Sequence, residues 1–161
     1  MHMWNDFFVA AAGGSAALAG LVFVALSVNI RNIIQSPHLP PRAAAAIGTL
    51  ILILVCSMAA LMPQPERALG IEVIVFSLYA CWLQIVSAHH GFRARVELQR
   101  PRWESILNAV LGQVQVLPFV IGGVLLLMQT SSGLYWIAAG CMATFVFSVL
   151  NAWVLLVEIL R

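Results

Sequence analysis

The chain has 161 residues, of which 62% are hydrophobic and 9% are charged. A soluble domain has about 25% charged residues, so this chain has too few polar groups to cover a water-exposed surface. Its formal net charge of +2 is too small for a nucleic-acid-binding protein. The composition therefore predicts an integral membrane protein.

Apolar stretches long enough to cross a membrane, which takes about 20 residues, occur at five places in the chain. They cover approximately residues 7–30, 43–62, 66–88, 105–128 and 134–159. Pro41 and Pro63 flank the second stretch, and Pro118 predicts a kink inside the fourth, because proline fits a helix start but disrupts a helix interior. We therefore expect a single all-α domain over residues 1–161, an integral membrane bundle of five transmembrane helices.

The arginines predict the orientation of this bundle. A topology with five spans puts seven of the eight arginines on one side, namely Arg31, Arg42, Arg93, Arg95, Arg100, Arg102 and Arg161. Arg67 alone lies on the other side. Because cytoplasmic loops of membrane proteins are enriched in Lys and Arg, we place the N-terminus outside and the C-terminus in the cytoplasm. The expected location is a bacterial inner (cytoplasmic) membrane, in a multi-pass arrangement.

Each predicted span has one face of small or polar residues. Residues three and four positions apart share a helix face, and in the first span this stepping joins Gly13, Ala17, Gly20, Val24 and Ser27. The same stepping joins Ala45, Thr49, Leu52, Cys56 and Ala59 in the second span, and Cys141, Thr144, Ser148, Asn151, Leu155 and Glu158 in the fifth. Bundles in lipid use small residues for close contact and polar residues for interhelical hydrogen bonds. Helix packing is the preferred interpretation, and the Gly/Ala faces favour a homo-oligomer.

The depth of the polar residues allows a second interpretation. In the predicted topology, nine polar side chains fall in the cytoplasmic half, namely Ser27, Asn29, Gln84, Asn108, Gln113, Gln115, Ser148, Asn151 and Glu158. Buried amides need partners, and water in a cavity would supply them. These nine residues form a candidate polar layer that would line a vestibule open to the cytoplasm. Direct pairing of the same side chains within the bundle is the alternative.

Two carboxylates lie within or close to the spans. Glu158 is the best single candidate for chemistry, because carboxylates inside a membrane are costly and usually functional. An ion pair with Arg31 is the preferred interpretation, since Glu158 lies three residues from the C-terminus. Glu72 is interpreted as reaching back to the outer interface, with Arg67 as a candidate partner.

Other residue types that carry chemistry form no recognisable pattern. The three cysteines lie in apolar runs without a CxxC spacing, which is typical of small buried side chains rather than of a redox or zinc site. His89 and His90 point about 100° apart on a helix, so at most one of them faces a given site. We therefore predict no catalytic residues, no metal site and no cofactor.

Two segments resemble a known family. The stretch at residues 20–29 (GLVFVALSVN) and the closing stretch at 151–161 (NAWVLLVEILR) are similar to those of a family of small bacterial multi-pass membrane proteins of unknown function. The likeness covers the whole chain. Some relatives carry the label of modulators of the membrane protease FtsH. The resemblance implies a bacterial membrane protein, and it carries over no catalytic or binding residue.

The leading hypothesis is a non-enzymatic structural or accessory protein that acts through helix contacts. Its expected partners are membrane lipids and either a second copy of the chain or a larger membrane complex, and no nucleic acid. The alternative is a channel, a transporter or a small-ligand-binding membrane protein that uses the candidate polar layer.

Overall fold

The computed structural model describes residues 2–35, 39–98 and 102–159. Within these ranges, side chains are described except at residues 2–3, 32, 39, 94–98, 102, 104–105, 108 and 151–159. The described chain folds into seven helices, α1 (His2–Val28), α2 (Ile30–Gln35), α3 (Leu39–Leu61), α4 (Glu66–Leu98), α5 (Arg102–Val114), α6 (Leu117–Leu127) and α7 (Gly133–Ile159). Five helical stretches are long and apolar enough to cross a membrane, namely Trp4–Val28, Pro40–Leu61, Glu66–Arg93, Ala109–Leu127 and Gly133–Leu150. The structure therefore confirms that the described residues form an all-α fold with five helices able to span a membrane.

The fourth predicted span is broken into α5 and α6, as the proline in its middle predicts. Pro118 has no N–H to donate to the carbonyl of Val114, four residues earlier. The N–H of Val116 instead donates to the Gln113 carbonyl (3.0 Å), and the N–H of Phe119 to the Val116 carbonyl (3.1 Å). The break therefore lies at residues 115–116, between α5 and α6.

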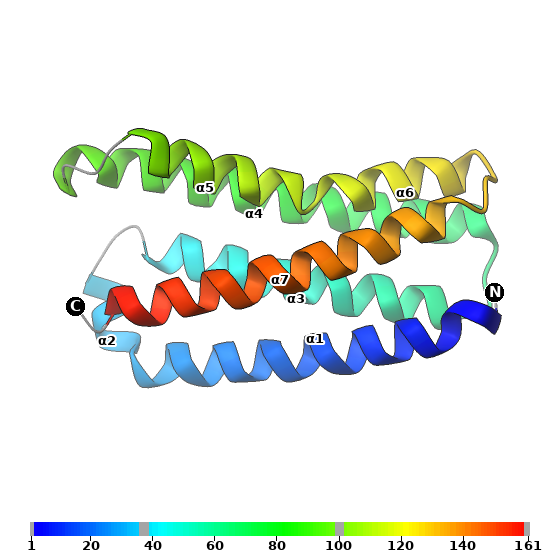
Figure 1. Cartoon of the computed structure of the whole chain (residues 1–161), viewed down its shortest axis with the longest axis horizontal. Helices are drawn as coiled ribbons and strands as arrows, with labels where there is room; N and C mark the ends of the chain where they lie inside the picture. The colour runs from blue at the N-terminus through cyan, green and yellow to red at the C-terminus, as the bar shows by residue number, and fades with distance from the viewer. Residues whose placement is uncertain (1, 36–38, 99–101, 160–161) are drawn as a thin grey trace.

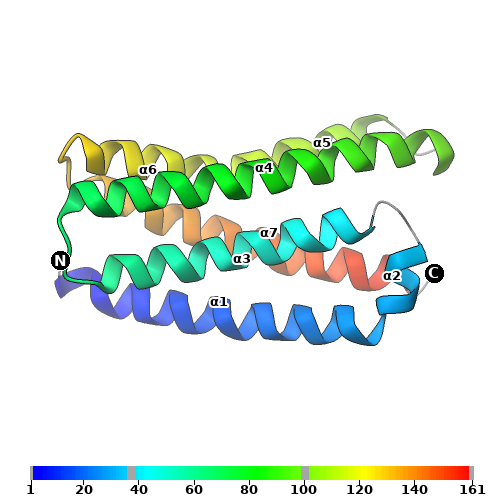
Figure 2. The same ribbon diagram turned by 180° about the vertical axis from the view of Figure 1, so that it is seen from behind.

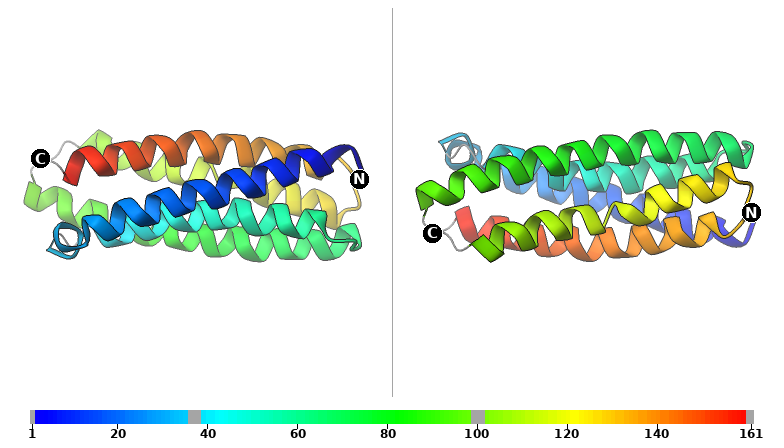
Figure 3. Two further views of the ribbon diagram at one scale, coloured as in Figure 1. Left: turned by 90° about the horizontal axis from the view of Figure 1, so that it is seen from below. Right: turned by 90° about the horizontal axis from the view of Figure 1, so that it is seen from above.

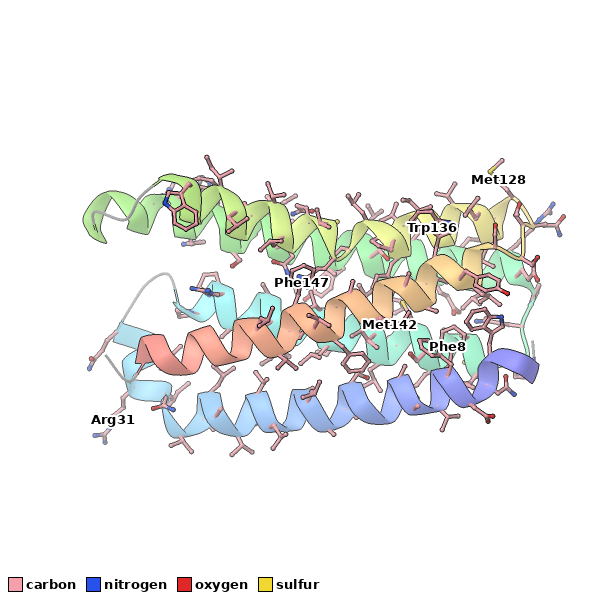
Figure 4. All side chains as sticks on the ribbon, in the orientation of Figure 1. Phe8, Arg31, Met128, Trp136, Met142 and Phe147 are labelled. Carbon is pink, nitrogen blue, oxygen red and sulfur yellow. The ribbon has the colours of Figure 1, made fainter. Side chains whose placement is uncertain are left out.

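The helices lie side by side along one long axis, as Figures 1 and 2 show from opposite sides. α1 begins at one end of the bundle and α7 finishes at the other (Figure 1), as five crossings require. Arg31, labelled in Figure 4, lies at the end where α1 is followed by α2. Arg67 lies at the opposite end, where its Nη2 donates to Gln129 Oε1 over 3.4 Å. The identity of the cytoplasmic end stays a prediction.

α3 is the central helix of the bundle. It packs against α1, α4 and α7, and α6 packs against both α4 and α7, an arrangement visible from the two sides in Figure 3. Of the apolar stretch of α3, 56% is buried, against 17% for that of α1. α5 packs mainly against α4. The fourth span therefore contacts α7 mainly through α6.

Glycines allow the closest helix contacts in the bundle. A Cβ added at Gly70 of α4 would lie 2.8 Å from the Gly123 carbonyl oxygen of α6. A Cβ added at Gly122 of α6 would lie 2.8 Å from the Gly133 carbonyl oxygen of α7. Because backbone atoms cannot move aside as a flexible side chain can, the spacing of α6 from α4 and α7 depends on these glycines.

Candidate functional site

Four buried polar residues form two hydrogen-bonded pairs in the middle of the bundle. Thr49 comes from α3, Gln115 from the break between α5 and α6, and Thr144 and Ser148 from α7. All four are at most 3% exposed. Thr144 Oγ1 donates to the Gln115 carbonyl oxygen over 3.2 Å, and Thr49 Oγ1 lies 3.4 Å from Ser148 Oγ. We call these four residues the central polar cluster.

The local structure explains why these side chains meet. Thr144 and Ser148 lie one helical turn apart on α7, so they share a face. The break in the fourth span frees the Gln115 carbonyl, because the N–H of Phe119 donates to Val116 instead. Thr144 supplies the missing hydrogen bond from the neighbouring helix. A non-helical backbone inside a membrane protein needs such internal partners, since lipid offers none.

The central polar cluster lies near the middle of the length of the bundle. Thr144 is eleven residues from Gly133 at the start of α7, which is about 17 Å at 1.5 Å per residue. Thr49 is ten residues from Leu39 at the start of α3, which is about 15 Å. Thr49 and Thr144 are therefore each about midway along their helices, α3 (Leu39–Leu61) and α7 (Gly133–Ile159).

The hydroxyl protons of this cluster are already used in hydrogen bonds. Thr144 donates to the Gln115 carbonyl, and Thr49 Oγ1 donates to the Ala46 carbonyl over 2.9 Å. Ser148 is therefore the donor in its contact with Thr49, because a hydroxyl has one proton. The side-chain oxygen Oε1 of Gln115 is buried and has no hydrogen-bond partner. An unsatisfied buried acceptor costs about 1–3 kcal/mol, so this atom requires a partner or an explanation.

The structure separates the nine residues of the candidate polar layer. Gln115 and Ser148 belong to the central polar cluster. Gln84 of α4 lies against α5, where its Oε1 would be 2.7 Å from a Cβ added at Gly112. Gln113 is half-buried. The side chains of Asn108, Asn151 and Glu158 lie outside the described residues, as does the expected ion pair between Glu158 and Arg31.

Two members of that layer bond their own helix instead. Ser27 is exposed, and its hydroxyl donates to the Phe23 carbonyl over 2.8 Å. Asn29 Nδ2 donates to the Ala25 carbonyl over 3.0 Å. The nine residues also omit Thr49 and Thr144. Those two share the predicted polar faces of their spans. The expected topology puts Thr144 in the outer half, whereas Thr49 falls in the cytoplasmic half and the selection still did not include it.

Glu72 takes a different partner from the one the sequence favours. Its Oε2 accepts a hydrogen bond from Gln64 Nε2 over 2.9 Å, and the same nitrogen donates to the Ala59 carbonyl over 2.9 Å. Arg67 is turned toward Gln129 instead. Across the residues that the structure describes, no three His, Cys, Asp or Glu side chains are grouped to hold a metal.

The small-residue face of α1 points away from the rest of the chain. Gly13, Ala16, Ala17 and Gly20 are exposed or open on this face, and a Cβ added at either glycine would meet no atom within 4 Å. We call these four residues the α1 glycine stripe. The inward face of α1 carries Ala11 and Ser15 as well as Phe8, which points into the bundle in Figure 4. The expected packing face of α1 is therefore exposed on the single chain.

Comparison with protein-family models, with curated proteins and with solved structures gives no match. The resemblance to a bacterial membrane family therefore stays a prediction.

Proposed function

We propose that this protein is a non-enzymatic structural or accessory protein of a bacterial inner membrane, and that it acts through helix contacts with another chain. The observation that carries the proposal is the exposed α1 glycine stripe. Large apolar side chains suffice for contact with lipid tails, and α1 exposes such side chains next to the stripe, for example Leu21 and Phe23. The small residues of the stripe are not needed for lipid contact, but they allow a second helix to approach closely.

The use of glycine elsewhere in the chain supports this interpretation. Eight of the eleven glycines would bring an added Cβ within 4 Å of another atom, whereas Gly13, Gly20 and Gly91 would not. Glycine therefore serves mainly as a helix-contact residue in this protein. Gly13 and Gly20 lie two turns apart on one face of α1, which is the spacing of a helix-contact pair.

A second copy of the chain is the occupant that this stripe fits. Two-fold symmetric contacts use the same surface on both subunits. Ala17 follows Gly13 by four positions and Gly20 follows Ala16 by four, which is the small-xxx-small spacing that lets two identical helices cross closely. We therefore assign the stripe to a homo-oligomer, and contact with a larger membrane complex is the competing occupant.

Native mass spectrometry of the protein released from lipid nanodiscs tests this assignment. The unaltered chain should appear as a dimer or a higher oligomer. The double variant Gly13→Ile/Gly20→Ile should appear as a monomer, because the added side chains keep the helices apart. A Cβ added at Gly13 or at Gly20 would meet no atom of the same chain within 4 Å. The fold of the double variant should therefore be retained.

Ala139→Ile provides the matched control. Ala139 is an exposed small residue on α7, so its enlargement adds the same kind of bulk away from the stripe. This variant should keep the oligomeric state of the unaltered chain. A monomeric unaltered protein, or an oligomer that survives the double substitution on α1, contradicts the assignment.

A further inference from the structure

We propose that Asp6 makes the contact between two copies of this chain dependent on pH. When the α1 glycine stripes of two copies meet, their Asp6 carboxylates face each other and hold one proton between them. This inference rests on the proposed homo-oligomer and adds its regulation. It names the group that weakens the contact at neutral pH and strengthens it in acid.

Asp6 lies on the same face of α1 as the stripe. Seven residues complete two turns of a helix to within about 20°, and this interval separates Asp6, Gly13, Gly20 and Ser27 from one another. All four are exposed on the single chain. The buried Phe8 follows Asp6 by two residues, which is about 200° around the helix. A contact made by the two glycines therefore has Asp6 on the same line, opposite the buried face of α1.

The two-fold contact brings the two Asp6 side chains to one place. A two-fold axis along the membrane normal puts equal residues of the two copies at equal depth. Helices whose contact residues repeat every seven positions stay together along their length, because a slight supercoil keeps the repeat facing the partner. Asp6 is about 10 Å along the helix from Gly13, within such a contact. Each copy therefore supplies half of the carboxylate pair.

Two carboxylates at one place repel each other unless they share a proton. Asp6 falls inside Trp4–Val28, the stretch of α1 that is able to cross a membrane, and charges beside lipid are screened less than charges in water. A single proton taken from solvent removes the repulsion and forms a hydrogen bond between the two carboxyl groups. Two associated copies thus bind one proton more than two separate copies. By linkage, the association constant rises as the pH falls.

The helices packed against α1 bring no described base to Asp6. α1 packs mainly against α3 and α7. The one arginine of α3, Arg42, lies near the opposite end of the bundle. At the Asp6 end, α7 contributes Tyr135, whose ring lies against Trp4. Across the residues that the structure describes, Asp6 has no ion-pair or hydrogen-bond partner, so its charge is free to act on a second copy.

Three other charged or titratable residues belong to the same end of the bundle. Arg67 of α4 donates to the Gln129 side chain, and Glu66 is the first residue of α4. His2 precedes Asp6 by four residues and so shares its helix face; the His2 side chain lies outside the described residues. Glu66 and His2 are therefore replaced one at a time as controls.

Energy transfer between labelled copies measures the association. A single cysteine at Gln35, which is exposed at the opposite end of the bundle, carries a donor or an acceptor dye whose emission does not depend on pH. The three native cysteines are replaced by alanine. The full chain is placed in phosphatidylcholine vesicles, whose headgroups do not titrate in the range used, with equal pH on both sides. From about pH 8 to about pH 5, the association constant should rise roughly tenfold.

Three variants identify the group responsible. Asp6→Asn keeps the size of the side chain and removes its charge, so association should be equally strong at both pH values. Its association constant should be at least that of the unaltered chain in acid. Glu66→Gln removes a carboxylate at the same end but on α4, and His2→Gln removes the neighbouring imidazole. Both should keep the pH dependence of the unaltered chain.

The outcomes separate this proposal from the proposed function. An oligomer that depends on the α1 glycine stripe but not on pH overturns the proton-sharing pair alone, whereas a chain that is monomeric at every pH overturns both. Weaker association of Asp6→Asn also overturns the pair, because Asp6 would then attract a base of its partner. Loss of the pH dependence in Glu66→Gln or His2→Gln assigns it to another group and has the same consequence.

Discussion

Replacement of Gly70 by alanine tests whether α4 and α6 depend on a glycine contact. The new Cβ would lie 2.8 Å from the Gly123 carbonyl oxygen and 3.0 Å from the Leu127 backbone nitrogen. Ordinary van der Waals contact begins at 3.4 Å, so α4 and α6 must separate by about 0.6 Å. Because both obstructing atoms belong to the backbone, a side-chain rotation cannot relieve the clash.

The expected loss of stability follows from the behaviour of overpacked interiors. An extra carbon in a tightly packed interior typically costs about 1–3 kcal/mol. At roughly 2–4 °C per kcal/mol for a chain of this length, a loss of about 2 kcal/mol lowers Tm by roughly 4–8 °C. Gly91→Ala, on the same helix, should not lower Tm, because a Cβ there would meet no atom within 4 Å.

Buried thiols provide the assay for both variants. Cys56 and Cys141 are free and at most 1% exposed, so a thiol-reactive fluorescent dye labels them only when the bundle opens. Cys81 is half-buried, and it is replaced by alanine in every sample to remove its early signal. Equal labelling midpoints for Gly70→Ala and Gly91→Ala would refute the reasoning, since the two variants differ only in the space around the added carbon.

Three further predictions concern the ends of the bundle. Single cysteines are introduced at Thr130 or at Gln35 in a Cys-free chain, and intact cells are treated with an impermeant thiol reagent. The cysteine at Thr130 should react and the one at Gln35 should not, because the arginine-rich end is predicted to be cytoplasmic. The reverse pattern would invert the topology. Gln64→Leu should lower Tm by several degrees, because it leaves the half-buried carboxylate of Glu72 without its amide donor. Gln64→Asn should give an intermediate loss, because its shorter amide cannot reach as far. The Trp4 ring lies edge-on to the Tyr135 ring of α7, with ring centroids 4.6 Å apart. Trp4→Leu should therefore destabilise the contact between α1 and α7 by about 0.5–1.5 kcal/mol. An unchanged Tm would show that this contact contributes nothing.

The sequence predicts the spans well because their signal is local. A stretch of about 20 apolar residues must form a helix in lipid, since no other partner exists for its backbone. Pro118 likewise predicts the break between α5 and α6 from one residue, because the missing N–H is a property of proline itself. The long apolar runs and Pro118 thus determined the five spans and the bend in the fourth, whereas α2 and the part of α4 from residue 89 to Leu98 lie outside the predicted spans.

The tertiary structure alone decided which helix faces look inward. The stepping of small residues on α1 predicted a packing face, but that face points outward, and a different face, with Phe8, Ala11 and Ser15, is buried. The same kind of stepping on α7 does point inward, to Thr49 and Gln115. Lipid tails are as apolar as the bundle core, so hydrophobicity does not tell an inward face from an outward one. The rotation of each helix depends on close packing and on hydrogen bonds to residues distant in the chain, and a single stretch of sequence contains neither.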